Sequence, residues 1–374
     1  MKMNEDRCKV LICSPMNIQG GITQWTKHIK EYYIIHKNNI VEIDFFAMDR
    51  SGYVSDELSF IKRAIWGLRD YICLSKKLLQ KIKNDNRYNV IHIASSASIS
   101  LIKDIYILKK LRHFGGKTII HFHFGRIPQL YKSQNWEWML IRKVIALASS
   151  VIVIDKSSYE ALQDAGFTNV VLIPNPLSPN VERLVKNNST VERLENRILF
   201  AGHVIKTKGV FELIEACKDI PDIELKLIGK VLPEVEAELR KRWRYGKGNL
   251  VITNNIPFED VVKEMMSCSL FVLPTYTEGF PNVILESMAC GCPIITTPVG
   301  AIPEMLDIGG KKECGICVET QTVASLKMAI EKLLKDTELA YKLGNNAKNR
   351  VTSEYSMEKV WQQMCMIWNK TISV

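Results

Sequence analysis

Short apolar runs alternate with longer amphipathic segments along most of the chain. In the first half the runs are KVLICS, IVEIDFFAM, YNVIHIAS, KTIIHFHF, SSVIVID and NVVLIPN. Runs of this length that are bounded by turn residues are typical of strands buried on both faces. The segments between them, such as 22–33 and 58–83, have helical spacing. This rhythm predicts a parallel sheet with crossover helices.

The same pattern begins again after a polar segment over 176–196, which contains Pro176, Pro179 and Asn187-Asn188 and is predicted to be a linker. The second set of predicted strands is RILFAGH, IELKLIG, LVITNN, LFVLPT and PIITTPV. The predicted helices cover 210–218, 234–244, 258–267, 281–290, 322–351 and 356–369. The pattern predicts two doubly wound α/β domains, 1–178 and 190–352, with a cleft between them.

Length and composition agree with this organisation. The 374 residues exceed what one hydrophobic core usually serves, and 47% apolar with 24% charged residues is ordinary for a globular protein. Ten cysteines without an N-terminal signal peptide predict reduced thiols in the cytoplasm. The net charge of +10 favours acidic partners, but no nucleic-acid-binding motif is present, so we expect no nucleic acid partner.

The basic stretch 60–83, which carries Trp66, has two interpretations. It could lie as an interfacial helix on an anionic membrane, or it could be a solvated helix whose apolar side covers the core. The first interpretation predicts a cytoplasmic protein with peripheral contact to the inner face of the plasma membrane. The sequence leaves both open.

Two acids eight positions apart, Glu278 and Glu286, mark the candidate site. Pro281 suits the first position of a helix, and Gly291 stands where that helix should stop. Backbone N–H groups at the start of the helix would bind an anion such as a diphosphate. Glu286 could then accept hydrogen bonds from ribose hydroxyls, and Glu278 could hold a second polyhydroxyl group. The pattern predicts a nucleotide-sugar ligand.

These residues resemble a known signature. EGFPNVILE, ahead of ACGCPI, is similar to the E-x7-E motif of retaining glycosyltransferases of family 4, which have the GT-B fold. Other segments resemble family motifs in the same order: the glycine loop MNIQGGITQW, the histidine strand IIHFHFGR, IPNP, the phosphate-binding FAGHVIKTKG, and TPVGAIPE. The resemblance implies that a C-terminal helix, about 355–374, crosses back to the first domain, which would bind the acceptor while the second binds the donor.

The resemblance also implies roles for individual residues. Glu286 would bind the nucleotide ribose, Glu278 the donor sugar, and Lys208 the diphosphate leaving group. His123 would meet the transferred sugar, whereas the neighbouring His121 and His92 are expected to be structural. The remaining donor-binding residues would be Gly20, Gly21, His203, Gly279, Phe280, Pro281, Asn282 and Val283.

The chain departs from the family pattern in three places. His203 stands where the family usually has arginine, Gly229-Lys230 lacks the second glycine of a G-x-G motif, and PNP replaces PNG. A neutral imidazole supplies less charge than a guanidinium and no bidentate fork. Lys206 is a candidate to compensate. No Asp-x-Asp pair occurs, so we expect no metal and no cofactor other than the nucleotide-sugar co-substrate.

The predicted function is therefore a retaining, metal-independent glycosyltransferase of hexosyltransferase type. It would move a sugar from a nucleotide-diphosphate sugar to an acceptor hydroxyl on a glycan or lipid-linked oligosaccharide in cell-surface polysaccharide synthesis. Two alternatives stay open: a nucleotide-sugar epimerase or sugar phosphorylase on the same fold, and a non-catalytic nucleotide-sugar-binding subunit.

Overall fold

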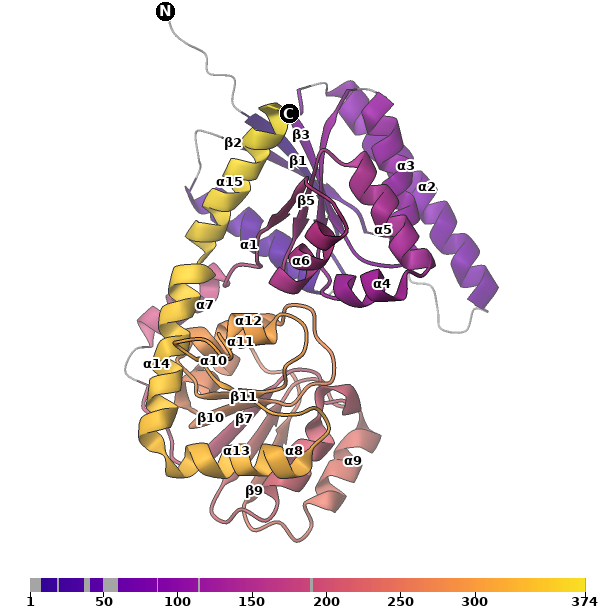
Figure 1. Ribbon diagram of the computed structural model, residues 1–374. Coiled ribbons are helices and arrows are strands. Elements are labelled where there is room, and N and C mark those ends of the chain that lie inside the picture. The colour runs from indigo at the N-terminus through magenta and orange to yellow at the C-terminus, as the bar shows by residue number, and fades with distance from the viewer. Residues whose placement is uncertain are drawn as a thin grey trace, which may run out of the picture. The chain divides into compact units, whose positions relative to one another are not determined.

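The computed structural model describes residues 8–18, 20–36, 41–49, 60–85, 87–113, 115–188 and 191–373, with the backbone alone at 60–69. The chain forms two compact units, shown in Figure 1. Unit 1 comprises Met1–Asn175 and Val360–Val374, and unit 2 comprises Pro176–Lys359. The C-terminal helix therefore belongs to the same unit as the N-terminal strands.

Unit 1 is built on a six-stranded parallel sheet of order β2-β1-β3-β4-β5-β6. The strands are β1 (Cys8–Ser14), β2 (Val41–Ala47), β3 (Val90–Ser95), β4 (Lys117–Phe122), β5 (Ser150–Val153) and β6 (Val170–Leu172). Every residue of β1, β3 and β5 is buried, as expected for strands with both faces covered. The six apolar runs are thus confirmed as neighbouring strands of one sheet.

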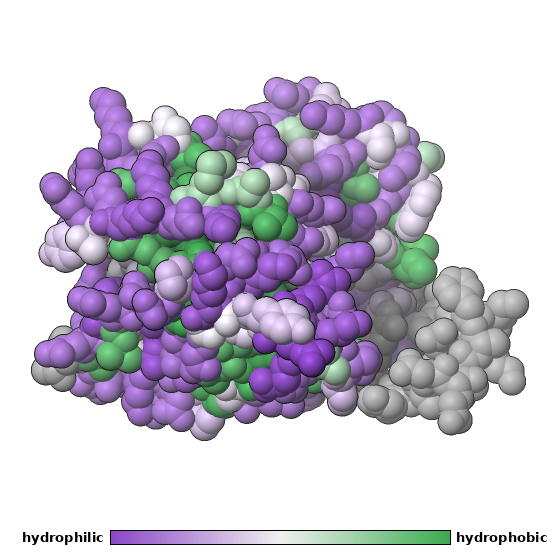
Figure 2. All heavy atoms as spheres, turned by 90° about the horizontal axis from the view of Figure 1, so that it is seen from below, coloured by the Kyte–Doolittle hydropathy of each residue, from purple (hydrophilic) through white to green (hydrophobic). Residues whose placement is uncertain are grey.

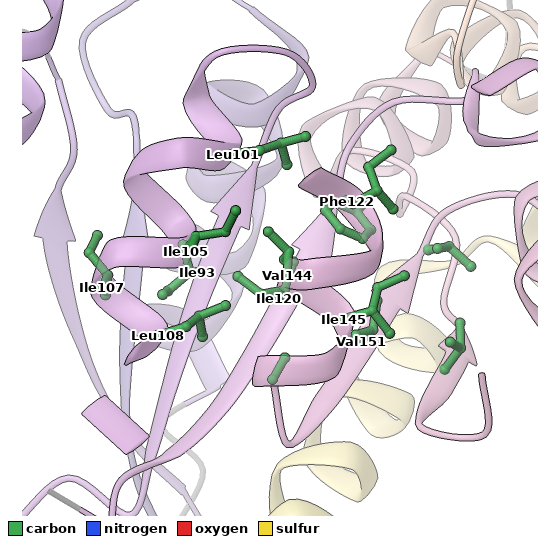
Figure 3. Packing of buried hydrophobic residues seen from close by; sticks show 14 of the residues in the cluster. Ile93, Leu101, Ile105, Ile107, Leu108, Ile120, Phe122, Val144, Ile145 and Val151 are labelled. Atoms are coloured by element: carbon green, nitrogen blue, oxygen red, sulfur yellow. The ribbon is translucent and has the colours of Figure 1, made fainter. Parts of the chain in front are cut away.

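The helices of unit 1 lie on both faces of this sheet. They are α1 (Gly21–His36), α2 (Phe60–Asn84), α3 (Ser100–His113), α4 (Ile127–Ser133), α5 (Trp136–Leu147), α6 (Lys156–Asp164) and α15 (Met357–Ser373). Figure 1 shows α2, α3 and α5 on one side of the sheet and α1 and α15 on the other. Close packing between the sheet and helices α3 and α5 forms the core in Figure 3, where Ile93, Ile105, Ile120, Phe122 and Val144 meet.

The opposite face of the sheet carries a layer of aromatic and imidazole rings. Trp368 of α15 donates its indole N–H to Nδ1 of His92 at 3.1 Å, and Nε2 of His92 lies 3.3 Å from Nδ1 of His121. The Trp25 ring of α1 contacts both imidazoles, at centroid distances of 5.5 and 5.0 Å. His92, His121 and Trp368 are 0% exposed, so both histidines are structural, as the sequence suggested.

Unit 2 repeats the architecture with a parallel sheet of order β12-β11-β10-β7-β8-β9. Its strands are β7 (Arg197–Ala201), β8 (Glu224–Ile228), β9 (Asn249–Thr253), β10 (Leu270–Leu273), β11 (Ile294–Thr296) and β12 (Ile316–Cys317). Its helices are α7 (Pro179–Asn187), the 3-10 helix η1 (Lys206–Lys208), α8 (Val210–Cys217), α9 (Pro233–Arg242), α10 (Phe258–Ser267), α11 (Asn282–Ala289), α12 (Ile302–Met305), α13 (Val323–Lys335) and α14 (Thr337–Glu354).

Two expectations about unit 2 were wrong. The predicted linker contains α7, because Val181 and Leu184 bury one side of an otherwise polar segment. The predicted helix over 322–351 is two helices, since Asp336 ends α13 and its carboxylate accepts the backbone N–H of Leu339 to cap α14. A capping aspartate inside a continuous helical pattern was the sequence signal for this break.

Hydrophobic residues on the surface occur in small groups. On the face shown in Figure 2 they are separated by hydrophilic residues and form no continuous apolar band. Within the described part of the chain, every helix is too short or too polar to span a bilayer.

We predict that unit 1 loses stability as the pH falls below about 6.5, because several imidazoles fold in the neutral form. Burial lowers the pKa of His92 to about 3, and burial together with Lys27 lowers the pKa of His28 to about 4. In this window the unfolded chain binds protons that the folded chain does not, so the free energy of unfolding decreases with decreasing pH. Each such histidine should contribute about 1–2 kcal/mol of loss between pH 7 and pH 5.

Urea unfolding of the His28→Gln variant at both pH values measures one of these contributions. The variant should lose less stability than the wild type over the same pH change. The matched control is His113→Gln, at an exposed histidine in the last turn of α3. If His28→Gln kept the full wild-type loss between pH 7 and pH 5, the assignment to His28 would be refuted.

Candidate functional site

Most of the predicted donor-binding residues lie at or near the carboxyl edge of the unit 2 sheet, whereas Gly20 and Gly21 belong to unit 1. Strands β7 and β10 are neighbours, but the chain continues from β7 to β8 on one side and from β10 to β11 on the other. The loops that follow β7 and β10 therefore diverge at a topological switch point, where open α/β sheets bind ligands. These loops, 202–209 and 274–281, carry His203, Lys208, Glu278 and Gly279.

The loop after β10 leads into α11, which begins one residue later than expected. Pro281 is the residue before the helix and not its first turn, and the N–H of Ile284 donates to the carbonyl of Pro281 at 3.1 Å. Phe280 and Pro281 are buried, while Asn282 and Val283 in the first turn are partly exposed. The predicted helix stop is confirmed, since α11 ends at Ala289 and Gly291 has φ +66°.

The loop after β11, which contains Gly300, packs against the turn that precedes α11. Gly300 packs against the backbone carbonyls of Glu278 and Gly279, and the N–H of Ala301 donates to the Gly279 carbonyl at 2.9 Å. Gly300 has φ +58°, and a Cβ there would collide with both carbonyls. The segment TPVGAIPE thus fixes the backbone at Glu278.

Glu286 lies on α11 and is only partly exposed. Burial raises the pKa of its carboxyl group to about 7. Within the described residues its carboxylate has neither a hydrogen-bond donor nor a cation as partner. A carboxyl group that is desolvated, unpaired and still accessible is suited to accept hydrogen bonds from a ligand.

Lys208 and Glu278 come together from the two loops as an ion pair, with side chains that are 25% and 15% exposed. The turn that carries Lys208 is held in place, because the N–H of Tyr276 donates to the Thr207 carbonyl at 2.9 Å. Gly209, with φ +73°, packs against the carbonyl of Pro274, where a side chain would collide. The carboxylate and the ammonium group are therefore positioned by backbone contacts between loops.

His203 shares this loop but lies on its outer side, where it is exposed. Gly202 and Gly229 pack against each other, and Val204 forms a bridge with Val231, so the loop after β7 is also joined to the loop after β8. Lys206, the candidate to compensate for the missing arginine, is exposed in η1. His203 and Lys206 are thus both on the loop that carries Lys208.

In unit 1, His123 follows β4 directly, at the carboxyl edge of the sheet. Its backbone N–H donates to the Ser95 carbonyl at 3.1 Å. Its ring lies 3.9 Å from that of His121 and 4.9 Å from that of Trp25, measured between centroids. Burial lowers the pKa of the imidazole to about 3, partly offset by the neighbouring Asn175 amide, so the ring is neutral at pH 7.

Gly20 lies in the turn between β1 and α1, and Gly21 is the first residue of α1. Among the described residues, a Cβ at either glycine would meet no atom within 4 Å beyond its neighbours in the chain, so packing against these residues does not require glycine. The carboxylate of Asp49 holds this turn, since it accepts the N–H groups of Met16 and Asn17 at 3.0 to 3.1 Å.

Sequence reasoning missed three supporting residues. Asp49 orders the glycine turn, and Tyr276 donates from its hydroxyl to Glu212 of α8 at 2.7 Å, which ties the loop after β10 to α8. Arg126, which directly follows the His123 strand motif, was quoted in the motif but given no role. Only the position of Arg126 in that motif was a usable signal, because the partners of Asp49 and Tyr276 are distant in the sequence.

Two family models match the chain in succession. The model described as Glycosyltransferase Family 4 matches residues 38–181, and the model described as Glycosyl transferases group 1 matches residues 182–350. A relative from Staphylococcus aureus, the capsular polysaccharide biosynthesis glycosyltransferase CapM, is 26% identical over 271 residues. That match covers 71% of this chain and 64% of the relative.

Solved structures have the same fold. Sucrose-phosphate synthase from Thermosynechococcus elongatus matches with a TM-score of 0.73 and 19% identity, covering 98% of this chain and 100% of that one. Anabaena HepE in complex with UDP matches with a TM-score of 0.69 and 16% identity, covering 97% and 100%. The predicted GT-B fold with two Rossmann-like domains is therefore confirmed. The two family models together match residues 38–350, and the chain therefore belongs to the glycosyltransferases of the family 4 type.

Proposed function

We propose that this glycosyltransferase moves a hexosyl group from a nucleotide-diphosphate sugar to an acceptor hydroxyl with retention of configuration and without a metal ion. The observation that carries the proposal is the arrangement around the start of α11. The N-terminus of this helix follows the loop that carries Glu278, and the Glu278 carboxylate is paired with the Lys208 ammonium group. A second carboxylate, that of Glu286, lies on the helix itself.

The donor diphosphate would occupy the first turn of α11. Backbone N–H groups at a helix N-terminus favour anions, and Lys208 adds a full positive charge. A diphosphate competes with Glu278 for Lys208, so donor binding would open the Lys208–Glu278 pair. The freed Glu278 carboxylate could then accept hydrogen bonds from the sugar hydroxyls.

Glu286 would bind the ribose. Its carboxyl group is already desolvated, so hydrogen bonds from ribose hydroxyls would stabilise the charged form that burial disfavours. Nucleotide binding is therefore expected to lower the pKa of Glu286 from about 7. HepE, the structural relative described with UDP, supports a nucleotide-sugar donor for this chain.

The reaction would proceed by attack on the same face of the sugar that the leaving group departs from. The developing charge on the diphosphate is stabilised by Lys208 and the α11 N-terminus, which makes a metal ion unnecessary. The departing diphosphate oxygen can accept the proton of the acceptor hydroxyl. Burial disfavours the protonated form of His123, so its imidazole would be a weak base, and its proposed role is to contact the sugar.

The acceptor is proposed to be a glycan or lipid-linked saccharide in the synthesis of a cell-surface polysaccharide. The relative CapM, named for capsular polysaccharide biosynthesis, supports this assignment. The epimerase, phosphorylase and non-catalytic alternatives have no comparable support in the matches. Turnover of donor alone, or transfer to free phosphate, would restore the enzymatic alternatives.

We also propose that unit 1 contacts the inner face of the plasma membrane from the cytoplasm, through the outer surface of α2 and α3. A groove of about 170 Å³ between these helices has an almost entirely apolar lining that includes Tyr71, Ile99 and Tyr106. Ile72 and Ile102 beside it are 45% and 46% exposed. The exposed charged residues of α2 after residue 69 and of α3 are all basic: Lys76, Lys77, Lys83, Lys109, Lys110 and Arg112. Apolar side chains within a basic surface favour an anionic interface.

We predict distinct kinetic effects for the two donor-site residues. Glu286→Ala should raise the donor KM about tenfold or more because it removes ribose contacts, whereas Lys208→Ala should lower kcat about 100-fold because it removes charge stabilisation of the leaving group. Steady-state transfer of radiolabelled sugar measures both constants. The matched control is Lys342→Ala, at an exposed lysine of unit 2. Wild-type values for both site variants would contradict the assignment.

The stereochemistry and the metal requirement have a separate test. The anomeric configuration of the product, followed by NMR during the first turnovers, should equal that of the donor. Activity should stay unchanged after dialysis against EDTA, because Lys208 and the α11 N-terminus supply the positive charge. An inverted product, or activity restored only by a divalent cation, would exclude the proposed mechanism.

Membrane contact predicts that the protein sediments with vesicles containing phosphatidylglycerol and less with neutral phosphatidylcholine vesicles. Ile102→Asp should reduce the bound fraction several-fold, because it places a negative charge in the apolar part of the surface. The matched control is Ile35→Asp, at an isoleucine of α1 that is 70% exposed. Equal losses in both variants would argue against a role for α2 and α3.

A further inference from the structure

A second polar cluster lies in unit 1 at the same sheet edge as His123. The Nη2 group of Arg126 donates to Oε1 of Glu137 at 2.7 Å and to Oγ of Ser98 at 3.1 Å, and the Ser98 hydroxyl donates to the same carboxylate oxygen at 2.9 Å. Arg126 follows His123 by three residues, and Ser98 lies in the loop after the adjacent strand β3. The cluster therefore joins the loops after β3 and β4.

In the ion pair between Arg126 and Glu137, the guanidinium is the exposed partner. The Glu137 side chain is 6% exposed in the first turn of α5, whereas that of Arg126 is 49% exposed. The carboxylate is therefore enclosed while the guanidinium faces solvent. The Nη1 and Nε groups of Arg126 have no partner in the described part of the chain, so these N–H donors are available to a ligand.

The cluster includes a backbone conformation that is unfavourable for its residue. Ser98 has φ +71°, which costs a residue with a Cβ about 1 kcal/mol or more. Its hydroxyl bonds to both charged partners help to hold it there. Strain of this kind at the carboxyl edge of an open α/β sheet, where such sheets bind ligands, points to a function beyond neutralising Glu137.

We propose that Arg126 binds an oxyanion on the acceptor, a phosphate ester or a carboxylate, and so contributes to acceptor specificity. The assignment of that anion to an acceptor rests on the proposed function. The guanidinium is fixed through Nη2, so an incoming anion meets preoriented donors and little side-chain entropy is lost on binding. The closeness of Arg126 to His123 in the chain puts the anion near the transferred sugar.

Binding of methyl phosphate, followed by 31P line broadening, tests the site without a known acceptor. All measurements use the full chain with Lys208→Ala, which removes the cation of the donor site. In this background Arg126→Gln combined with Glu137→Gln should weaken binding about tenfold. The paired substitution removes both charges, so no buried carboxylate is left alone. The matched control is Arg142→Gln, at an exposed arginine of α5.

Each outcome decides the proposal. Weaker binding in the paired variant and unchanged binding in Arg142→Gln supports it, and the same titration with acetate tells a carboxylate from a phosphate ligand. Equal losses in both variants, or no binding once Lys208 is replaced, overturn it. Binding of UDP to the wild-type chain is measured separately, and its absence would contradict the proposed function without affecting the result for Arg126.

Discussion

The ion pair between Lys208 and Glu278 is the contact on which the candidate donor site depends. It joins two loops that leave neighbouring strands in opposite directions, and it keeps an ammonium group beside the start of α11. Backbone contacts at Thr207, Gly209 and Gly300 surround the pair and limit how its side chains can move. The attraction between the two side chains also holds both in position until a more highly charged ligand, such as a diphosphate, competes for Lys208. The same contacts therefore order the two loops and position the charged groups of the candidate site.

The two units accommodate polar side chains at their sheets in different ways. In unit 2 polar groups at the sheet edge are paired by charge, as with Lys208 and Glu278. In unit 1 the imidazoles at the sheet are stacked on indoles and folded without charge, since desolvation opposes protonation. Arg126 differs from these imidazoles, because its guanidinium is paired with the buried carboxylate of Glu137.

Much of this architecture could be predicted from the sequence because parallel strands buried on both faces form continuous apolar runs. The strand, loop and helix predicted around the E-x7-E spacing are also present, since Glu278 lies in the loop after β10 and Glu286 lies on α11. The failures have local causes. Helix α7 was missed because a half-buried amphipathic segment has a polar composition. The break between α13 and α14 was missed because a single capping side chain, Asp336, interrupts an otherwise continuous helical pattern.

The other features that could not be predicted depend on residues that interact although they are far apart in the sequence. Asp49 lies 32 positions from Asn17, whose N–H it accepts, and the two cannot be matched by spacing alone. Tyr276 and Glu212 are likewise 64 positions apart. The same limit applies to the pKa of Glu286, since its rise comes from neighbours that tertiary packing supplies. Motifs indicate candidate residues, whereas packing determines their protonation.

The bond between Trp368 and His92 has a consequence for how the protein is made. Unit 1 is assembled from segments that lie on either side of unit 2 in the chain, and α15 supplies a buried ring to the sheet. A ribosome delivers the chain in order, so the strands of unit 1 emerge well before the helix that covers one of their faces. Until α15 is synthesised, the imidazole face of that sheet lacks Trp368 and has only the cover that α1 supplies through Trp25.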